Sequence, residues 1–253
     1  MTDIVVIGAG PAGVLAALHA AELGARTEIV TSGQFGGMAA NDGPVPVRVL
    51  GYSARLMREA RQLSRYGIVV SEPILDYERL LGRVREVIGE VRRHSGLRER
   101  IDALGVTVHE QFGARFVDAN TVEAENGVRL QAEKFIICTG GVSRRLPIPG
   151  FELTSTHSDA FQLPEPPPSM LVIGAGNTGV QVASTFQAFG TRVQLFEPGP
   201  RILRTEDEEI TAELRNAFRA SGIAVHEQFG NIESFEKTPT GSAHELLQEW
   251  PPR

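Results

Sequence analysis

Residues 4–13 read IVVIGAGPAG, and this stretch decides the fold class. The apolar run Ile4–Ile7 predicts a short buried strand, and the apolar pattern that continues through Leu23 predicts a helix. Three glycines occupy the turn between them: Gly8, Gly10 and Gly13. Such a turn needs glycine for a sharp bend, for close approach of the backbone to a pyrophosphate, and for close packing of helix on strand. The stretch therefore predicts a dinucleotide-binding strand-turn-helix unit.

The same design occurs a second time, in residues 170–179, which read MLVIGAGNTG. Gly174 lies 166 positions after Gly8, and Gly176 and Gly179 repeat the spacing of the other two glycines. The flanks also match, because Ile7, Val14, Ala17, Gly24 and Arg26 fall on Ile173, Val180, Ala183, Gly190 and Arg192. This internal repeat predicts an α/β fold with two Rossmann-like βαβ units and two separate dinucleotide sites.

Each glycine-rich turn leads into the start of a predicted helix. Pro11 and Ala12 open the first helix, and Asn177 and Thr178 open the second. Proline is tolerated at the first helical position because the amide there has no intrahelical partner. The free N–H groups and the partial positive charge of a helix start attract phosphate, so these residues are expected to contact the cofactors.

An acidic residue about 20 positions after the glycines distinguishes the two copies. Glu197 follows the predicted strand 192–196 and should accept a hydrogen bond from a ribose 2′-hydroxyl and repel a 2′-phosphate. This favours NAD over NADP, although Arg201 and Arg204 leave NADP open and Glu197 could also be a plain surface residue. Thr31 holds the matching position of the first copy, so its ribose contact must be weaker or come from elsewhere.

The region between the two copies carries two further patterns. Residues 54–66 and 77–104 have apolar residues at helical spacing, and the arginines that alternate with glutamates there indicate solvated helix faces. From 106 to 138 the period shortens towards two, with a turn at Asn126-Gly127. This segment predicts a small antiparallel β meander that ends in the strand 135–138.

Composition limits the classes of function. The 253 residues include 25 basic and 31 acidic side chains, a net charge of −6 that argues against a nucleic-acid partner. No apolar run approaches the ~20 residues of a membrane-spanning helix, and the N-terminus lacks the features of a signal peptide, so we expect a cytoplasmic protein. Cys138 is a single thiol, best interpreted as a small buried side chain, and the six histidines show no metal-ligand spacing. We predict no metal site.

The chain resembles the FAD-dependent pyridine nucleotide-disulfide oxidoreductases, most closely the dihydrolipoamide dehydrogenase and mercuric reductase branch. The elements that carry the resemblance, in order, are residues 8–13, Gly36-Gly37, residues 136–141, residues 146–150, and residues 174–179 with Glu197. The resemblance implies that the first glycine-rich turn holds FAD, that Thr139-Gly140 lies beside the FAD nucleotide, and that the second turn holds NAD(P). It also implies transfer of hydride from the nicotinamide to the flavin and onward to an acceptor.

Four departures from the family pattern limit what this chemistry can be. The two positions of the family's redox-active cysteines are Ala39 and Pro44, so dithiol chemistry of that kind is excluded. The lysine that touches the flavin in the family falls on Arg48, and its glutamate partner falls on Gln181. The aromatic residue that often covers the nicotinamide is Asn177. Arg48 and Gln181 are expected near the flavin, where a charge-assisted hydrogen bond replaces the ion pair.

The predicted domains are an FAD-binding domain (1–150), a linker (151–168), a partial NAD(P)-binding domain (169–240) and an irregular tail (241–253). Full-length family members are expected to be homodimers, and their later Gly-Asp motif and dimerisation domain have no counterpart here. Two hypotheses follow. The chain either passes electrons from NADH through FAD to a small acceptor, such as a quinone, a dye or oxygen, or is a truncated, inactive fragment that only binds nucleotide.

Overall fold

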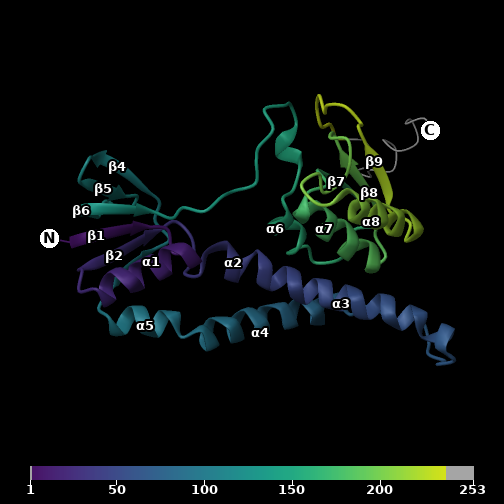
Figure 1. The fold of residues 1–253 in the computed structure, drawn as a ribbon, viewed down its shortest axis with the longest axis horizontal. Helices are drawn as coiled ribbons and strands as arrows, with labels where there is room; N and C mark the ends of the chain where they lie inside the picture. Colours follow the sequence, from purple (N-terminus) through teal and green to yellow (C-terminus); the bar gives the residue numbers. More distant parts are fainter. Residues whose placement is uncertain (1, 238–253) are drawn as a thin grey trace. The chain divides into compact units, whose positions relative to one another are not determined.

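The computed structural model describes residues 2–237, which form two compact units (Figure 1). The first unit contains the chain up to Pro46 together with Val84–Ser143, and the second contains Val47–Arg83 and the chain from Arg144 onward. The predicted tail, 241–253, lies outside the described residues. These units are defined by packing, whereas the predicted domains are defined by the cofactor that each would bind. The predicted domain boundaries therefore stay predictions.

The first unit is built on a six-stranded sheet with the order β3-β2-β1-β6-β5-β4. Its strands are β1 (Thr2–Ile7), β2 (Thr27–Thr31), β3 (Thr107–Glu110), β4 (Ala114–Asp118), β5 (Thr121–Ala124) and β6 (Arg129–Ile137). β1 pairs in parallel with β2 and β6, and β2 with β3, whereas β4, β5 and β6 pair antiparallel. β6 is therefore shared, because residues 129–131 pair with β5 in the meander and residues 132–137 lie beside β1.

The two faces of this sheet are covered by different elements, as alternation along β1 and β2 dictates. Val6 and Ile29 pack with α1 (Pro11–Glu22) and α5 (Leu97–Ala103) on one face. Val5 and Val30 point to the other face, where they pack against side chains of β5 and β6. The predicted strand and helix of the first copy are thus confirmed, with β1 beginning two residues earlier than the apolar run.

Two expectations for the middle of the chain need correction. The meander expected over 106–138 contains only β4, β5 and β6, because β3 pairs in parallel with β2. A period of two shows that a strand has two unlike faces but carries no information on its partner. The helical pattern of 77–104 divides into α4 (Tyr77–Ser95) and α5, because Gly96 adopts a left-handed conformation with φ of 57° and ends α4.

The second unit repeats the strand-helix-strand arrangement with a smaller, fully parallel sheet, β7-β8-β9. β7 (Ser169–Ile173), α7 (Asn177–Ala188), β8 (Arg192–Glu197), α8 (Glu208–Ala220) and β9 (Ala224–Glu227) follow in order. The fully buried Phe186 and Leu195 mark the core between α7 and β8. The strand and helix predicted for the second copy are therefore confirmed.

The remaining elements connect these parts: α2 (Gly37–Asn41), α3 (Pro44–Gln62), the 3₁₀ turns η1 (Leu63–Tyr66) and η2 (Phe151–Leu153), and α6 (His157–Ala160). α3 and α4 each cross the division between the units, at residues 46/47 and 83/84. Among residues 2–237, no helix combines the length and the apolar character that crossing a bilayer requires.

Candidate functional site

The first glycine-rich turn connects β1 to α1 and is fixed by backbone hydrogen bonds. The Gly8 N–H donates to the Val30 carbonyl at 2.7 Å, so the turn leaves β1 while still attached to β2. Gly8 has a φ of 109°, a conformation that side chains other than glycine rarely adopt. Gly10 is the residue before α1, and its carbonyl accepts the Val14 N–H at 2.9 Å.

Two of the three glycines are required by packing within the protein. A Cβ atom at Gly8 would lie 2.2 Å from the Cys138 carbonyl oxygen, and one at Gly13 would lie 1.8 Å from the Gly8 carbonyl oxygen. Real Cβ atoms do not approach other atoms this closely. Glycine at position 8 therefore leaves room for the backbone of Cys138, directly after β6, and glycine at position 13 allows α1 to pack on the turn.

Gly10 differs, because within residues 2–237 neither packing nor backbone conformation requires glycine at this position. A Cβ atom there would have no neighbour within 4 Å, and its φ of −73° with ψ of −179° is extended backbone open to any residue. The start of α1 has neither a side-chain cap nor an acidic residue in its first turn. The turn therefore offers open space in front of helix N–H groups, which suits the approach of an anion.

The second turn, between β7 and α7, has the same backbone. The Gly174 N–H donates to the Phe196 carbonyl at 2.7 Å, and a Cβ atom at Gly179 would lie 1.9 Å from the Gly174 carbonyl oxygen. Gly176 has a φ of −74° and a ψ of −176°, and a Cβ atom there would have no neighbour within 4 Å. The internal repeat seen in the sequence is thus a repeat of backbone geometry as well.

Glu197 makes the second turn chemically different from the first. Its carboxylate accepts the Ala175 N–H and the Gly199 N–H, each at 2.8 Å, and is therefore held at the glycine-rich turn. Arg201, which left NADP open, donates to the carbonyls of Leu203 and Glu206. Its guanidinium is thus used to hold its own loop, whereas the exposed Arg204 still leaves NADP open.

The first turn has no carboxylate in the matching place. Thr31 is buried at the end of β2. The nearest acidic residue on that strand, Glu28, lies inside the sheet, where it accepts the Thr2 hydroxyl and contacts His109 Nε2 at 2.8 Å. Glu28 is therefore committed to cross-strand contacts within the sheet.

Besides β2, which accepts the Gly8 N–H, the structure brings two more predicted segments to the first turn. The Gly36 N–H donates to the Ala9 carbonyl at 2.9 Å, and a Cβ atom at Gly37 would lie 2.7 Å from the Gly10 Cα. On the other side, the Thr139 backbone nitrogen lies 3.2 Å from the position of a Cβ atom at Gly8, and the exposed Gly140 follows with a φ of 68°. Three segments far apart in the sequence thus surround one turn.

The other predicted contacts belong to the second unit. Arg48 is exposed near the start of α3, and Gln181 is exposed on α7. No hydrogen bond joins these two side chains in the part of the chain that the structure describes. Asn177 and Thr178 are the exposed first two residues of α7, beside Gly176. Their expected contacts with cofactors stay predictions.

Neither position that matches the family's redox-active cysteines carries a thiol. Ala39 lies in α2 and Pro44 begins α3. Cys138 is half-buried directly after β6, where its Cβ atom lies 3.2 Å from the position of a Cβ atom at Gly13. It fills space under α1. Within residues 2–237, no three His, Cys, Asp or Glu side chains gather as a metal site would require.

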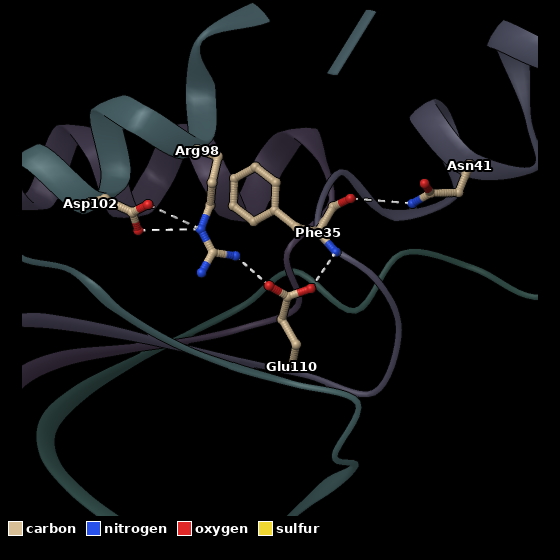
Figure 2. Close-up of polar contacts among 5 residues, drawn as sticks. All are labelled: Phe35, Asn41, Arg98, Asp102 and Glu110. Carbon is tan, nitrogen blue, oxygen red and sulfur yellow. Dashed lines mark hydrogen bonds and ion pairs between the residues drawn. The ribbon is translucent and has the colours of Figure 1, made fainter. Parts of the chain in front are cut away.

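One group of residues near the first turn was missed by sequence reasoning. Glu110 is the register partner of Thr31 on the neighbouring strand β3, and its carboxylate accepts the Phe35 N–H at 3.1 Å (Figure 2). Arg98 on α5 forms an ion pair with the same carboxylate. The pairing of β3 with β2 brings Glu110 to Phe35, and the sequence pattern gave no sign of that pairing.

Comparison with known proteins agrees with this geometry. A family model described as pyridine nucleotide-disulphide oxidoreductase matches residues 2–243. The chain is 32% identical over 236 residues to a dihydrolipoyl dehydrogenase of Zymomonas mobilis, covering 88% of this chain and 48% of that protein. It is 30% identical over 236 residues to the Bacillus subtilis dihydrolipoyl dehydrogenase, covering 87% and 49%. The chain thus spans about half the length of the curated relatives it matches.

A solved structure shows the same fold. The HOCl-induced flavoprotein disulfide reductase RclA of Escherichia coli superposes with a TM-score of 0.77 at 23% identity, over 93% of this chain and 51% of that chain. With two glycine-rich turns of one geometry and a family match over nearly its whole length, this chain belongs to the pyridine nucleotide-disulphide oxidoreductase family, whose members depend on FAD and use NAD(P)H.

Proposed function

We propose that this chain is an FAD-dependent oxidoreductase that passes hydride from NAD(P)H to FAD and on to a small-molecule acceptor, without a redox-active disulfide. The observation that carries the proposal is the open space at Gly10 and Gly176, two glycines that neither backbone conformation nor packing explains. A phosphate group that must reach the backbone explains both.

The residues around each turn fit the two cofactors. FAD would be held by the first turn and the segments packed on it, namely Gly8, Gly10, Pro11, Ala12, Gly13, Gly36, Gly37, Thr139 and Gly140, with Thr31 and Arg48 as further predicted contacts. NAD(P)H would be held by Gly174, Gly176, Asn177, Thr178, Gly179 and Glu197. The carboxylate of Glu197, already fixed at the turn, supports a preference for NAD because it would repel a 2′-phosphate.

The residues at positions 39 and 44 determine the class of acceptor. Alanine and proline can neither form a disulfide nor attack one, so electrons have no thiol relay at this place. The acceptor must therefore take electrons without a thiol intermediate, and a quinone can do so. It takes up the two electrons from NADH and two protons, one from NADH and one from solvent, to give a quinol and NAD⁺. Disulfide substrates such as lipoamide should therefore be poor acceptors.

The acceptor preference can be measured by NADH consumption without oxygen. We expect the FAD-loaded chain to oxidise NADH with p-benzoquinone and to show no rate above background with lipoamide. Lipoamide reduction as fast as quinone reduction would contradict the proposal. No NADH consumption with any acceptor would favour the second hypothesis, a chain that binds nucleotide without turnover.

The cellular setting and the assembly state are also proposals. A cytoplasmic location is consistent with a single thiol that cannot form an intrachain disulfide. Homodimerisation is an expectation for full-length relatives, which are about twice as long as this chain.

A further inference from the structure

A short loop connects β2 to α2 and carries the glycine pair against the first nucleotide turn. We call residues 34–41, the end of this connection together with α2, the glycine-pair loop. Its contact with the turn consists of the Gly36 N–H bond to the Ala9 carbonyl and the close approach of Gly37 to Gly10. The position of this loop therefore determines how much room remains in front of Gly10.

Glu110 and Arg98 hold this loop from the neighbouring strand and helix (Figure 2). One carboxylate oxygen of Glu110 accepts the Phe35 N–H at 3.1 Å, and the other oxygen pairs with the Arg98 guanidinium. The Arg98 guanidinium also lies over the Phe35 ring, 5.4 Å from its centre. Phe35, directly before Gly36, is thus held by Glu110 at its backbone and by Arg98 at its side chain.

Arg98 is itself fixed by a second carboxylate on its own helix. Its Nε donates to Asp102 Oδ1 at 3.2 Å, one turn along α5. Burial lowers the pKa of Arg98, but the bonds to Glu110 and Asp102 outweigh this and raise it overall. The guanidinium therefore stays charged. The two side chains are 43% (Arg98) and 31% (Glu110) exposed, so solvent screens the pair in part.

Asn41 within the loop and Arg92 on α4 add further hydrogen bonds to it. Asn41 donates from Nδ2 to the Phe35 carbonyl at 3.3 Å and to the Gly37 carbonyl at 2.7 Å. Arg92 on α4 donates to the Gln34 side-chain oxygen at 2.7 Å and to Asn41 Oδ1. These contacts do not involve the backbone N–H groups of Phe35 and Gly36, which donate to Glu110 and to the Ala9 carbonyl.

We infer that Glu110 and Arg98 are positioning residues for the first nucleotide site, which hold the glycine-pair loop on the Gly8–Gly13 turn so that the dinucleotide meets a preformed backbone. Glu110 stands at the carboxyl edge of the sheet beside Thr31, the place where the first copy offers no carboxylate of its own. The identity of the ligand as FAD rests on the proposed function. The claim that Glu110 and Arg98 hold the loop in place without ligand does not.

The test compares Glu110→Ala and Glu110→Gln with Glu99→Gln, which changes an exposed carboxylate beside Arg98 on α5. Hydrogen exchange of the peptide containing Phe35 and Gly36 is measured without ligand, together with the urea midpoint of unfolding and the Kd for FAD. Loss of a charge-assisted bond should speed exchange in this peptide and weaken FAD binding, each about tenfold, with the midpoint nearly unchanged. Glu110→Gln keeps an oxygen for the Phe35 N–H and should recover part of both effects, and Glu99→Gln should change neither.

The outcomes separate this inference from the proposed function. Unchanged exchange in Glu110→Ala would overturn the inference, as would faster exchange with an unchanged Kd for FAD. An effect spread over all peptides with a lower urea midpoint would show a general structural role and would overturn it too. If the unaltered chain binds no FAD, the proposed function fails, and the exchange experiment still decides whether Glu110 holds the loop.

Discussion

Replacing Gly13 with alanine should destabilise the first unit by about 3 kcal/mol or more and abolish FAD binding with it. The added methyl group would lie 1.8 Å from the Gly8 carbonyl oxygen, which belongs to the backbone and cannot rotate away. Either α1 must lift from the sheet or the turn must open, and both changes remove packing of the buried Val14 and Ala17. Urea-induced unfolding followed by circular dichroism measures the effect.

Gly51→Ala is the matched control for this prediction. Gly51 lies inside α3, and a Cβ atom there would have no neighbour within 4 Å. Alanine is the better helix former by about 1 kcal/mol, so this variant should be as stable as the original chain or slightly more stable. Equal stability of Gly13→Ala and Gly51→Ala would show that the first turn is not packed as described.

Replacing Gly10 with alanine should have the opposite profile, with an intact fold and FAD affinity reduced about 100-fold, equivalent to about 2.7 kcal/mol. The methyl group would have no neighbour within 4 Å in the described part of the chain, so stability should be unchanged. It does enter the space in front of the α1 N-terminus, where a pyrophosphate must come close to the backbone. Quenching of flavin fluorescence on titration gives the Kd.

Gly176→Ala provides the reciprocal control, because the second turn repeats the backbone of the first. This variant should keep its affinity for FAD and lose affinity for NADH by a similar factor, measured by NADH fluorescence. If both variants affected the same ligand, the assignment of one cofactor to each turn would be wrong. If Gly10→Ala bound FAD as tightly as the original chain, the pyrophosphate would not lie at this turn.

The parts of the fold that could be predicted from the sequence are those specified by local pattern. Residues 4–13 and 170–179 each contain an apolar strand, three glycines at fixed spacing and a helix start, and the structure gives both the same hydrogen bonds. The φ values of Gly10 and Gly176 differ by only one degree, which shows how closely repeated spacing becomes repeated geometry.

The parts that could not be predicted depend on pairings between distant segments. The direction of β3 is set by its position beside β2, some 80 residues earlier in the chain, and no feature of residues 107–110 reveals it. The role of Glu110 follows from that pairing, because the pairing alone brings its carboxylate to Phe35. Glu197 was found because it lies on the same strand-turn-helix unit as its glycines, whereas Glu110 belongs to a different segment from the turn it serves.

The visible absorption spectrum of the freshly purified chain, recorded before and after addition of NADH without oxygen, tests the central claim most directly. We predict flavin bands that are present on purification or restored by added FAD, and that bleach when NADH is added. Such bleaching requires both glycine-rich turns to hold their cofactors in one competent molecule. A colourless protein that FAD cannot restore, or bound flavin that NADH leaves oxidised, would contradict the proposal that this chain transfers electrons between the two.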